Sequence, residues 1–220
     1  MAEALSPDAF VPGQPLGEQL FHMIARAIVS GELGEGERIR DEVLARRFHV
    51  SRMPVREALQ RLERIGLLEI LPSRRTVVTT RDARSVAEAL EYAGYQAGIV
   101  VHASLPRLSP PERREAERLA YVAVDALDDP ERASAARRDL FAYLSRRSGN
   151  RLHHSHMRDM EYAFERNLSS LMPPPEARSA VREDYRALAH AIAANDAAEA
   201  ERLVRVLHGI PPAIGPRPAP

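Results

Sequence analysis

The chain has 220 residues, enough for one large or two modest domains, and 45% of them are hydrophobic, which is enough to form real cores. Its 31 basic and 31 acidic residues balance, so any positive charge that attracts a nucleic acid must be local. The absence of cysteine excludes disulfides and thiolate metal sites. The sequence has neither an apolar run of about 18 residues nor a secretion signal, so we expect a cytoplasmic protein without membrane spans.

The N-terminal segment is expected to be a disordered tail over residues 1–13, because it shows no hydrophobic periodicity. A first helix then opens at residues 16–20. Its apolar side chains recur at helical spacing, which predicts that they face a core. The inward residues are Leu20, Ile24, Ala27 and Ile28.

Residues 37–78 predict a helix, a tight turn, a second helix and a two-stranded wing. Val43, Leu44 and Phe48 have helical spacing in the first of these helices. The link His49–Val50 is too short for anything but a sharp turn. This order of elements is typical of a DNA-reading module.

The second helix of the module has clear signals at both ends. Ser51 is expected to be its N-cap, and Pro54 lies in its first turn, where a missing N–H breaks no intrahelical hydrogen bond. Gly66 is expected to end it. The stripe that should face the core is Val55, Ala58, Leu59 and Leu62, and the residues that should point away from it are Arg52, Arg56 and Gln60.

Two short runs of apolar and β-branched residues, 67–71 and 76–80, follow this helix and predict an antiparallel hairpin. Residues 72–75 join the two runs and end in Arg74 and Arg75. The tip of the predicted wing is therefore basic.

The predicted module matches the chemistry that DNA requires. A recognition helix docks by its N-terminal end, so long cationic side chains in its first turns reach base edges or phosphates in the major groove. Arg52 and Arg56 have these positions, and the sequence does not say which of them reads a base. The alternative is that they belong to an ordinary solvated helix face, because every side-chain cation in this chain apart from histidine is arginine.

From residue 82 to residue 208 the pattern is helix after helix, with no strand signal. Capping signals open three of the helices, at Ser109–Glu112, Asp129 and Asp196. The helices are expected over residues 82–105, 110–127, 130–148, 151–171, 176–194 and 197–208. The first carries Val86, Leu90, Ala93, Ala97 and Val100 on one side.

These helices predict an all-α bundle of six or seven helices over residues 82–208. Together with the winged module over residues 14–80, they make the whole chain mainly α. Residues 209–220 are rich in proline and lack periodicity, so we expect a second disordered tail.

The run HVSRMPVREAL at residues 49–59, with Leu62, Gly66–Leu68 and the wing, resembles the winged helix-turn-helix of the GntR family of bacterial transcription regulators. The resemblance covers about residues 14–80 and implies a DNA-binding domain. It implies DNA contacts from Arg40, Ser51, Arg52, Met53, Pro54, Arg56, Arg74 and Arg75.

Two positions depart from the family pattern. Arg75 stands where the family usually has a glycine at the tip of the wing, and Arg40 stands where a small capping residue is usual. An arginine at a wing tip can itself enter a narrow minor groove. Contacts from the wing are therefore less well defined than contacts from the helix.

The helical region resembles the FCD-type effector-binding domain of the FadR-like subfamily of the same family. The residues that carry this resemblance are Ser148–Asn150 and Tyr185–Ile192, followed by Asp196 and Ala200. It implies a homodimer on a near-palindromic operator, with DNA binding modulated by a small molecule in the helical domain. The sequence does not say whether the ligand releases or strengthens DNA binding.

Many members of that subfamily hold a divalent metal with one Asp and three His. The corresponding positions of this chain are Arg137, Phe141, Tyr185 and Leu207, none of which can act as the same ligand, so we expect no metal and no other cofactor. A shift of register toward Asp139 and His208 does not restore a complete ligand set. Five histidines are expected on solvated or interfacial faces: His153, His154, His156, His190 and His208.

The residues at the lost metal positions suggest another ligand. Arg137, Phe141 and Tyr185 combine one cation, one aromatic wall and one phenol, which could bind an organic acid directly. One alternative is a collapsed cavity filled by Phe141 and Leu207, with Arg137 turned to solvent. Another is a pocket elsewhere, near Tyr92, Tyr95 and Gln96.

The sequence also bears on two other classes of function. The sequence contains no phosphate-binding glycine loop, no G-x-S-x-G, no H-E-x-x-H and no cysteine nucleophile, so we expect that the protein is not an enzyme. A helical scaffold that binds only proteins would explain the bundle, but it would leave the SRMPVREAL run and the basic wing without a role.

Overall fold

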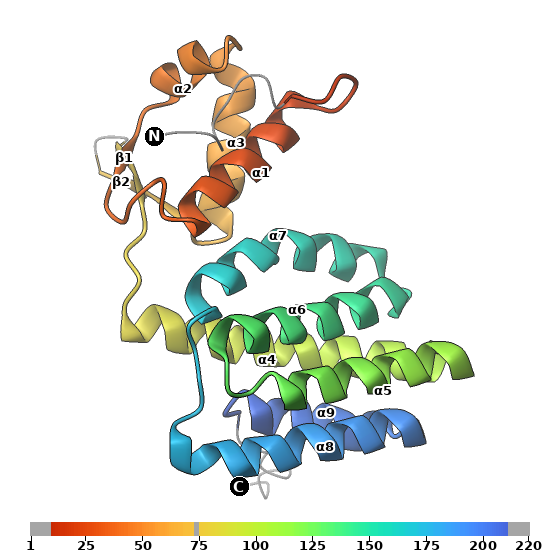
Figure 1. The fold of residues 1–220 in the computed structure, drawn as a ribbon. Coiled ribbons are helices and arrows are strands. Elements are labelled where there is room, and N and C mark those ends of the chain that lie inside the picture. Colours follow the sequence, from red (N-terminus) through yellow and green to blue (C-terminus); the bar gives the residue numbers. More distant parts are fainter. Residues whose placement is uncertain (1–9, 73–74, 211–220) are drawn as a thin grey trace, which may run out of the picture. The chain divides into compact units, whose positions relative to one another are not determined.

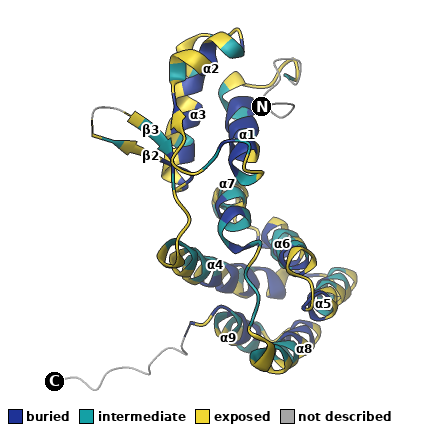
Figure 2. Ribbon diagram, turned by 60° about the vertical axis from the view of Figure 1, so that its left-hand side comes forward, coloured by how far each residue is buried: buried dark blue, intermediate teal, exposed yellow. Residues whose placement is uncertain are grey.

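The computed structural model describes residues 10–72 and 75–210. The chain divides into two compact units, with the division between Asp82 and Ala83 (Figure 1). Each unit has its own core, as the alternation of buried and exposed faces in Figure 2 shows. The prediction of a mainly α chain, with a winged helix-turn-helix followed by a helical bundle, is confirmed.

The N-terminal unit is built on three helices, and α1 packs against α3. Their bounds are α1 (Leu16–Val29), α2 (Asp41–Arg47) and α3 (Arg52–Arg64). The inward stripes predicted for the first and third helices are all buried. Burial of such stripes is the main source of stability for short helices, which are marginal alone.

The turn between α2 and α3 is as tight as its length predicted. His49 has a left-handed backbone with φ of 53°, and the Val50 N–H donates to the Ala45 carbonyl at 3.0 Å. Leu44 and Phe48 face the core, whereas Val43, which shares their helical spacing, is 45% exposed. The reason is that neighbouring helix residues lie about 100° apart around the axis, and a seven-residue helix can bury only one narrow face.

The sheet of this unit has one strand more than the sequence predicted. It contains β1 (Arg38–Ile39), β2 (Leu68–Leu71) and β3 (Arg75–Val78), in the order β1-β3-β2 with antiparallel pairing. Ile39 lies opposite Thr76, and Leu68 lies opposite Val78. A two-residue strand has no periodicity that a sequence pattern could detect, because only its pairing with β3 defines it.

Parts of both segments that we expected to be disordered make contacts. The Phe10 ring lies 5.8 Å from the Phe48 ring, and the Val11 N–H donates to the Gln19 side chain at 2.6 Å. At the other end, Ile210 is 5% exposed. Residues 1–9 and 211–220 lie outside the described residues.

The C-terminal unit is a bundle of six α-helices within residues 83–210, as predicted. The helices are α4 (Ala83–Ser104), α5 (Pro110–Asp125), α6 (Pro130–Arg147), α7 (Arg151–Leu168), α8 (Arg178–Ala194) and α9 (Ala197–Leu207). Short 3-10 turns cover Leu105–Arg107 and Pro175–Ala177. Within the described residues, no helix is long and apolar enough to cross a membrane.

Side chains fix the starts of several of these helices. The Asp129 carboxylate accepts from the Arg132 N–H, and the Asp196 carboxylate accepts from the Glu199 N–H, both at 3.0 Å. The Asn150 side chain accepts from the His153 N–H, so Asn150 caps the start of α7. These bonds satisfy backbone donors that have no partner inside the helix.

The bundle core is formed where α4 packs on α9, α5 packs on α6 and α8, and α8 packs on α9. Fully buried residues include Leu140, Leu144, Leu188, Ile192 and Val204. The later half of α4 is buried and its start is exposed (Figure 2). Accordingly, Val86 and Leu90 are only half-buried, although their spacing predicted a continuous inward face.

Candidate nucleic-acid interface and ligand cavity

The N-terminal end of α3 presents a cationic and exposed face. Val55 and Leu59 anchor the opposite side of the helix in the core, so Arg52 and Arg56 necessarily point outward. Between them Met53 is 66% exposed, which is unusual for a large apolar side chain. The first turn of α3 contains no acidic residue, so its free N–H groups face no negative charge from their own turn.

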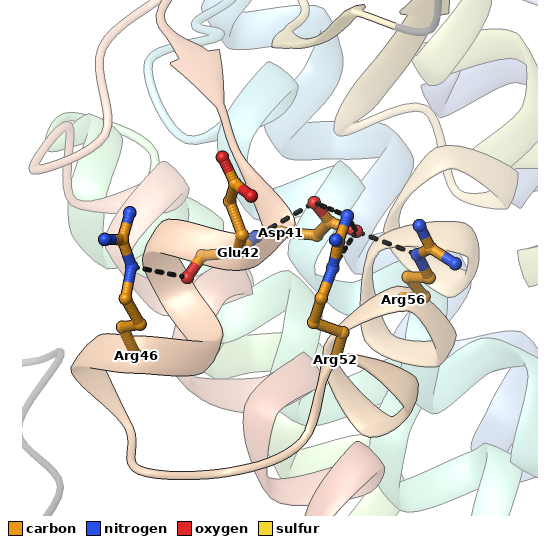
Figure 3. A network of polar contacts seen from close by, with 5 residues as sticks. All are labelled: Asp41, Glu42, Arg46, Arg52 and Arg56. Atoms are coloured by element: carbon orange, nitrogen blue, oxygen red, sulfur yellow. Dashed lines mark hydrogen bonds and ion pairs between the residues drawn. The ribbon is translucent and has the colours of Figure 1, made fainter.

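Both outward arginines bind the same carboxylate on α2 (Figure 3). Arg52 donates from Nε at 3.3 Å and from Nη2 at 2.9 Å to Asp41 Oδ2, and Nη2 also lies 3.0 Å from Oδ1. Arg56 donates from Nε to Oδ2 at 2.8 Å. The Asp41 side chain is about a quarter exposed, whereas those of Arg52 and Arg56 are 50% and 60% exposed.

The electrostatics of this cluster favour the charged forms of Asp41 and Arg52. Burial acts to raise the pKa of Asp41, but hydrogen bonds from Arg56 and Arg52 outweigh it and hold the pKa below its ordinary value. The bond to Asp41 raises the pKa of Arg52 further. The sequence reasoning did not identify Asp41, because it lies 11 residues before Arg52 and only the fold brings the two together.

The other residues expected at DNA surround this face or lie on the wing. Arg40 is exposed at the N-cap position of α2, and Ser51 is exposed at the N-cap position of α3, where its hydroxyl makes no capping bond. Pro54 is half-buried in the first turn of α3. Arg75 is exposed at the start of β3, and Arg74 lies outside the described residues.

The helical unit contains a cavity of about 430 Å³. It is lined by residues of α4, α6 and α7 and by one residue after α9, His208. Its apolar wall is formed by Ala93, Ala97, Val100, Phe141, Ala142, Met157, Phe164 and Leu168. Its polar lining consists of Ser134, Arg137, Arg138, Ser145, Arg146, His154, Arg158, Glu161 and His208.

Two of the predicted effector residues, Arg137 and Phe141, line this cavity. Arg137 donates from Nη2 to the Leu168 carbonyl at 3.1 Å, which holds its guanidinium group at the wall. Tyr185 is buried at 3% exposure and does not line the cavity. Burial raises the pKa of Tyr185, although the neighbouring charge of Arg137 acts in the opposite direction.

The histidines of the cavity correct the expectation that they lie on solvated or interfacial faces. His208 is 8% exposed, its Nδ1 lies 2.7 Å from the Val204 carbonyl, and its ring meets Phe141 edge-on. Burial lowers the pKa of His208 to about 4, so the ring is neutral, with Nδ1–H as donor and Nε2 as acceptor. His154 also lines the cavity and lies 3.1 Å from the Ser145 hydroxyl. Of the five histidines for which that expectation was made, His156 and His190 are exposed.

Positive charge dominates the cavity. Arg138 binds the Ser134 hydroxyl at 2.8 Å and lies 3.7 Å from Glu165. Arg146 and Arg158 form no ion pair within the described residues. Glu161 is the single acid of the lining, and burial of its carboxyl raises its pKa despite the nearby charges of Arg138, Arg146 and Arg158.

The lining does not fit a divalent metal. No group of three or more His, Asp or Glu is close enough to hold an ion within residues 10–72 and 75–210. The fixed charge of Arg137 would also repel a cation at this wall. Asp139 is exposed outside the lining, and Leu207 packs against the bundle core.

The third group of predicted effector residues lies apart from the cavity lining. Tyr92 lies within hydrogen-bonding distance of His156, at 2.9 Å, and Gln96 contacts His153 at 2.8 Å. Tyr95 is 41% exposed. Two of these three side chains are therefore engaged in contacts between α4 and α7.

Two family models match the chain. The model of the bacterial regulatory proteins of the GntR family matches residues 16–78, and the model of the FCD domain matches residues 98–208. The second match alone covers half of the chain.

Individual relatives agree with these matches. The HTH-type transcriptional repressor RspR of Escherichia coli (strain K12) is 33% identical over 88 residues, which are 37% of this chain and only 39% of that protein. The HTH-type transcriptional regulator Mce2R of Mycobacterium tuberculosis (strain CDC 1551 / Oshkosh) is 28% identical over 225 residues, which cover 93% of this chain and 92% of that protein.

Solved structures share the fold. The structure of E. coli McbR/YncC aligns with a TM-score of 0.62 at 21% identity, over 88% of this chain and 93% of that chain. A putative transcriptional regulator GntR from Rhodococcus sp. RHA1 aligns with a TM-score of 0.59 at 19% identity, again over 88% and 93%. The matched families and relatives are transcription regulators and not enzymes. The chain therefore belongs to the GntR family of bacterial transcription regulators and carries a C-terminal FCD ligand-binding domain.

Proposed function

We propose that this protein is a homodimeric, sequence-specific DNA-binding regulator of the FadR-like subfamily, acting in the cytoplasm, and that α3 is its recognition helix. The observation that carries the proposal is the exposed pair Arg52 and Arg56 at the N-terminal end of a helix whose other face is locked into a core. A cationic end of this kind fits the major groove, where arginine binds guanine through two hydrogen bonds.

The other residues assigned to DNA differ in the part of the duplex that each would contact. Met53 is placed to contact a thymine methyl group, because it is apolar and exposed between the two arginines. Arg40, Ser51, Pro54, Arg74 and Arg75 are assigned to the sugar-phosphate backbone around the helix and under the wing. These contacts set register and affinity, while the α3 arginines supply sequence preference.

The dimer belongs to the same proposal. One short recognition helix gives a modest half-site affinity, and two helices about one DNA turn apart multiply it. The expected operator is therefore a near-palindrome, and sedimentation of the protein with and without the duplex measures the stoichiometry.

The experiment selects preferred duplexes from a random pool and measures binding by fluorescence anisotropy. We expect Arg52→Ala and Arg56→Ala each to weaken operator binding by about 1–3 kcal/mol. The matched control is Arg64→Ala, which removes an exposed arginine from the far end of the same helix. Equal binding by all three variants and the wild type would favour the protein-binding scaffold instead.

The helical cavity is proposed to bind an organic acid that modulates DNA binding, without a metal. Its volume lies in the range of small-molecule sites, and it combines an apolar wall with four arginines and one acid. Arg137 would hold the carboxylate through paired hydrogen bonds, and the apolar wall would cover the rest of the ligand. An open cavity lined by Arg137 argues against the collapsed alternative, in which this side chain turns to solvent.

Thermal unfolding with aliphatic carboxylic acids of increasing chain length tests this assignment. We expect stabilisation by at least one acid, unchanged by a chelator, lost in Arg137→Gln and kept in Arg132→Gln. Arg132 is an exposed arginine on the same helix that does not line the cavity. Stabilisation that survives Arg137→Gln would show that the acid is held elsewhere.

A further inference from the structure

The carboxylate of Asp41 binds both α3 arginines through their Nε groups. It accepts the Nε–H of each, and from Arg52 it also accepts Nη2 (Figure 3). These bonds restrict the rotation of two long and exposed side chains. Side-chain freedom of this kind is lost when a base is bound, at a cost to affinity.

The bonds leave the other side of each guanidinium group open. A guanidinium has one edge formed by Nε and Nη2 and a second edge formed by Nη1 and Nη2. Asp41 engages Nε and Nη2 of Arg52 but only the Nε–H of Arg56, so Nη1 of Arg52 and both Nη groups of Arg56 remain available. Free Nη groups can donate hydrogen bonds to the acceptors of guanine, as a pair in Arg56.

The charge of Asp41 has a second effect. Hydrogen bonds from both arginines lower the pKa of Asp41 and favour its ionised form. The two arginines and this carboxylate together therefore carry a net charge of +1. A carboxylate beside the recognition face weakens attraction to phosphates at any sequence, since that attraction depends on net local charge. The charge of Asp41 therefore lowers affinity for every duplex, and sequence preference has to come from how the arginines are positioned.

We propose that Asp41 is the positioning residue for sequence recognition. It holds Arg52 and Arg56 by their Nε groups, so that their free Nη groups meet the bases in a fixed arrangement, and its charge lowers attraction to DNA of any sequence. This inference rests on the proposed function of α3 as a recognition helix.

The test compares Asp41→Asn with Glu42→Gln on the selected operator and on a scrambled duplex of equal length. Glu42 is the next residue, is exposed, and acts on Arg52 through space without an ion pair, so Glu42→Gln makes the same charge change nearby. We expect both variants to bind the scrambled duplex more tightly than the wild type does. Only Asp41→Asn should lose operator preference, by roughly ten- to a hundredfold for loss of one well-placed arginine contact.

Two further measurements separate positioning from damage to the fold. Asparagine keeps an acceptor for the Glu42 N–H, which Asp41 now binds at 2.8 Å, so the melting temperature should change little. Asp41→Glu restores the carboxylate, and we expect it to recover most of the operator preference.

The outcomes are distinct. Equal operator preference in Asp41→Asn and Glu42→Gln would overturn the positioning role while leaving α3 as the recognition helix. A rise in operator preference in Asp41→Asn would also overturn it, because Asp41 would then compete with the bases. A wild-type protein that prefers no duplex would defeat the proposed function itself, and with it this inference.

Discussion

The two units each hold a cluster of arginines, and the clusters differ in how their charge is balanced. On α3 the two exposed arginines share one ionised carboxylate, Asp41. In the helical cavity four arginines face one acid, Glu161, whose pKa is raised because burial disfavours its charged form. The carboxylate of Asp41 holds the α3 arginines in place. In the cavity, by contrast, the arginines outnumber the single acid of the lining.

Under the proposed functions, this difference corresponds to two kinds of anion recognition. A duplex is a large polyanion that attracts any exposed cation, so a protein that must discriminate gains from holding its arginines in place. A small acid has to be drawn into a partly enclosed space, where an uncompensated charge is screened less and acts more strongly.

The largest expected difference between the two clusters is in how binding affinity depends on salt concentration. A dimer that contacts about 6–10 phosphates should lose roughly 10³- to 10⁵-fold in operator affinity between about 50 and 200 mM salt. Binding of an organic acid in the cavity should change by less than about tenfold, because salt screens a partly buried pair weakly. Anisotropy titrations for the operator and calorimetry for the acid give the two slopes, and equal slopes would contradict the distinction.

Substitutions in the two cores should act on separate units. Leu62 and Leu188 are both fully buried, and Leu62→Ala or Leu188→Ala should each cost about 2–5 kcal/mol of unfolding free energy. Hydrogen exchange followed by mass spectrometry should locate the loss of protection in residues 10–82 for the first variant and 83–210 for the second. A loss of protection spread evenly over both units in either variant would contradict the division into two separate cores.

Helix caps should also distinguish the units. Asp129→Ala should cost about 1 kcal/mol, because the Asp129 carboxylate accepts from the Arg132 N–H at the start of α6, the helix that carries Arg137. Ser51→Ala should cost less than about 0.5 kcal/mol, because the Ser51 hydroxyl makes no capping bond. Chemical denaturation measures both, and an equal cost would mean that the Ser51 hydroxyl does cap α3 in solution.

The smallest effect concerns Glu161 and pH. An anion in the cavity favours the protonated form of Glu161, so affinity for the acid should rise as pH falls through the raised pKa of this group. Burial lowers the pKa of His154, so this cavity residue gains its positive charge at lower pH than an ordinary histidine does. At neutral pH Glu161→Gln should tighten binding by roughly three- to tenfold, as expected for one like charge in a partly screened site.

The control for this prediction is Glu131→Gln, an exposed acid at the start of α6 that does not line the cavity. Calorimetry across pH should give a flatter profile for Glu161→Gln than for the control. Identical profiles would show that Glu161 does not face the bound acid.

Much of the fold was predicted from sequence because it depends on local signals. The α3 stripe of Val55, Ala58, Leu59 and Leu62 repeats at helical spacing, and Asp129 and Asp196 are capping residues placed directly before helices. The positions of Arg52 and Arg56 on the outer face follow from the same periodicity. The limits of this reasoning appear at Val43 and at β1, where a helix is too short to bury a broad face and a strand is too short to show a period.

The sequence by itself determined the helices and the outward arginines of α3, because each depends on residues close together in the chain. Tertiary structure alone decided that Asp41 binds Arg52 and Arg56, and that Arg137, His154 and His208 line one cavity. These contacts join residues separated by 11 to 71 positions. Packing of whole helices sets such distances, and no local pattern of residue types encodes them.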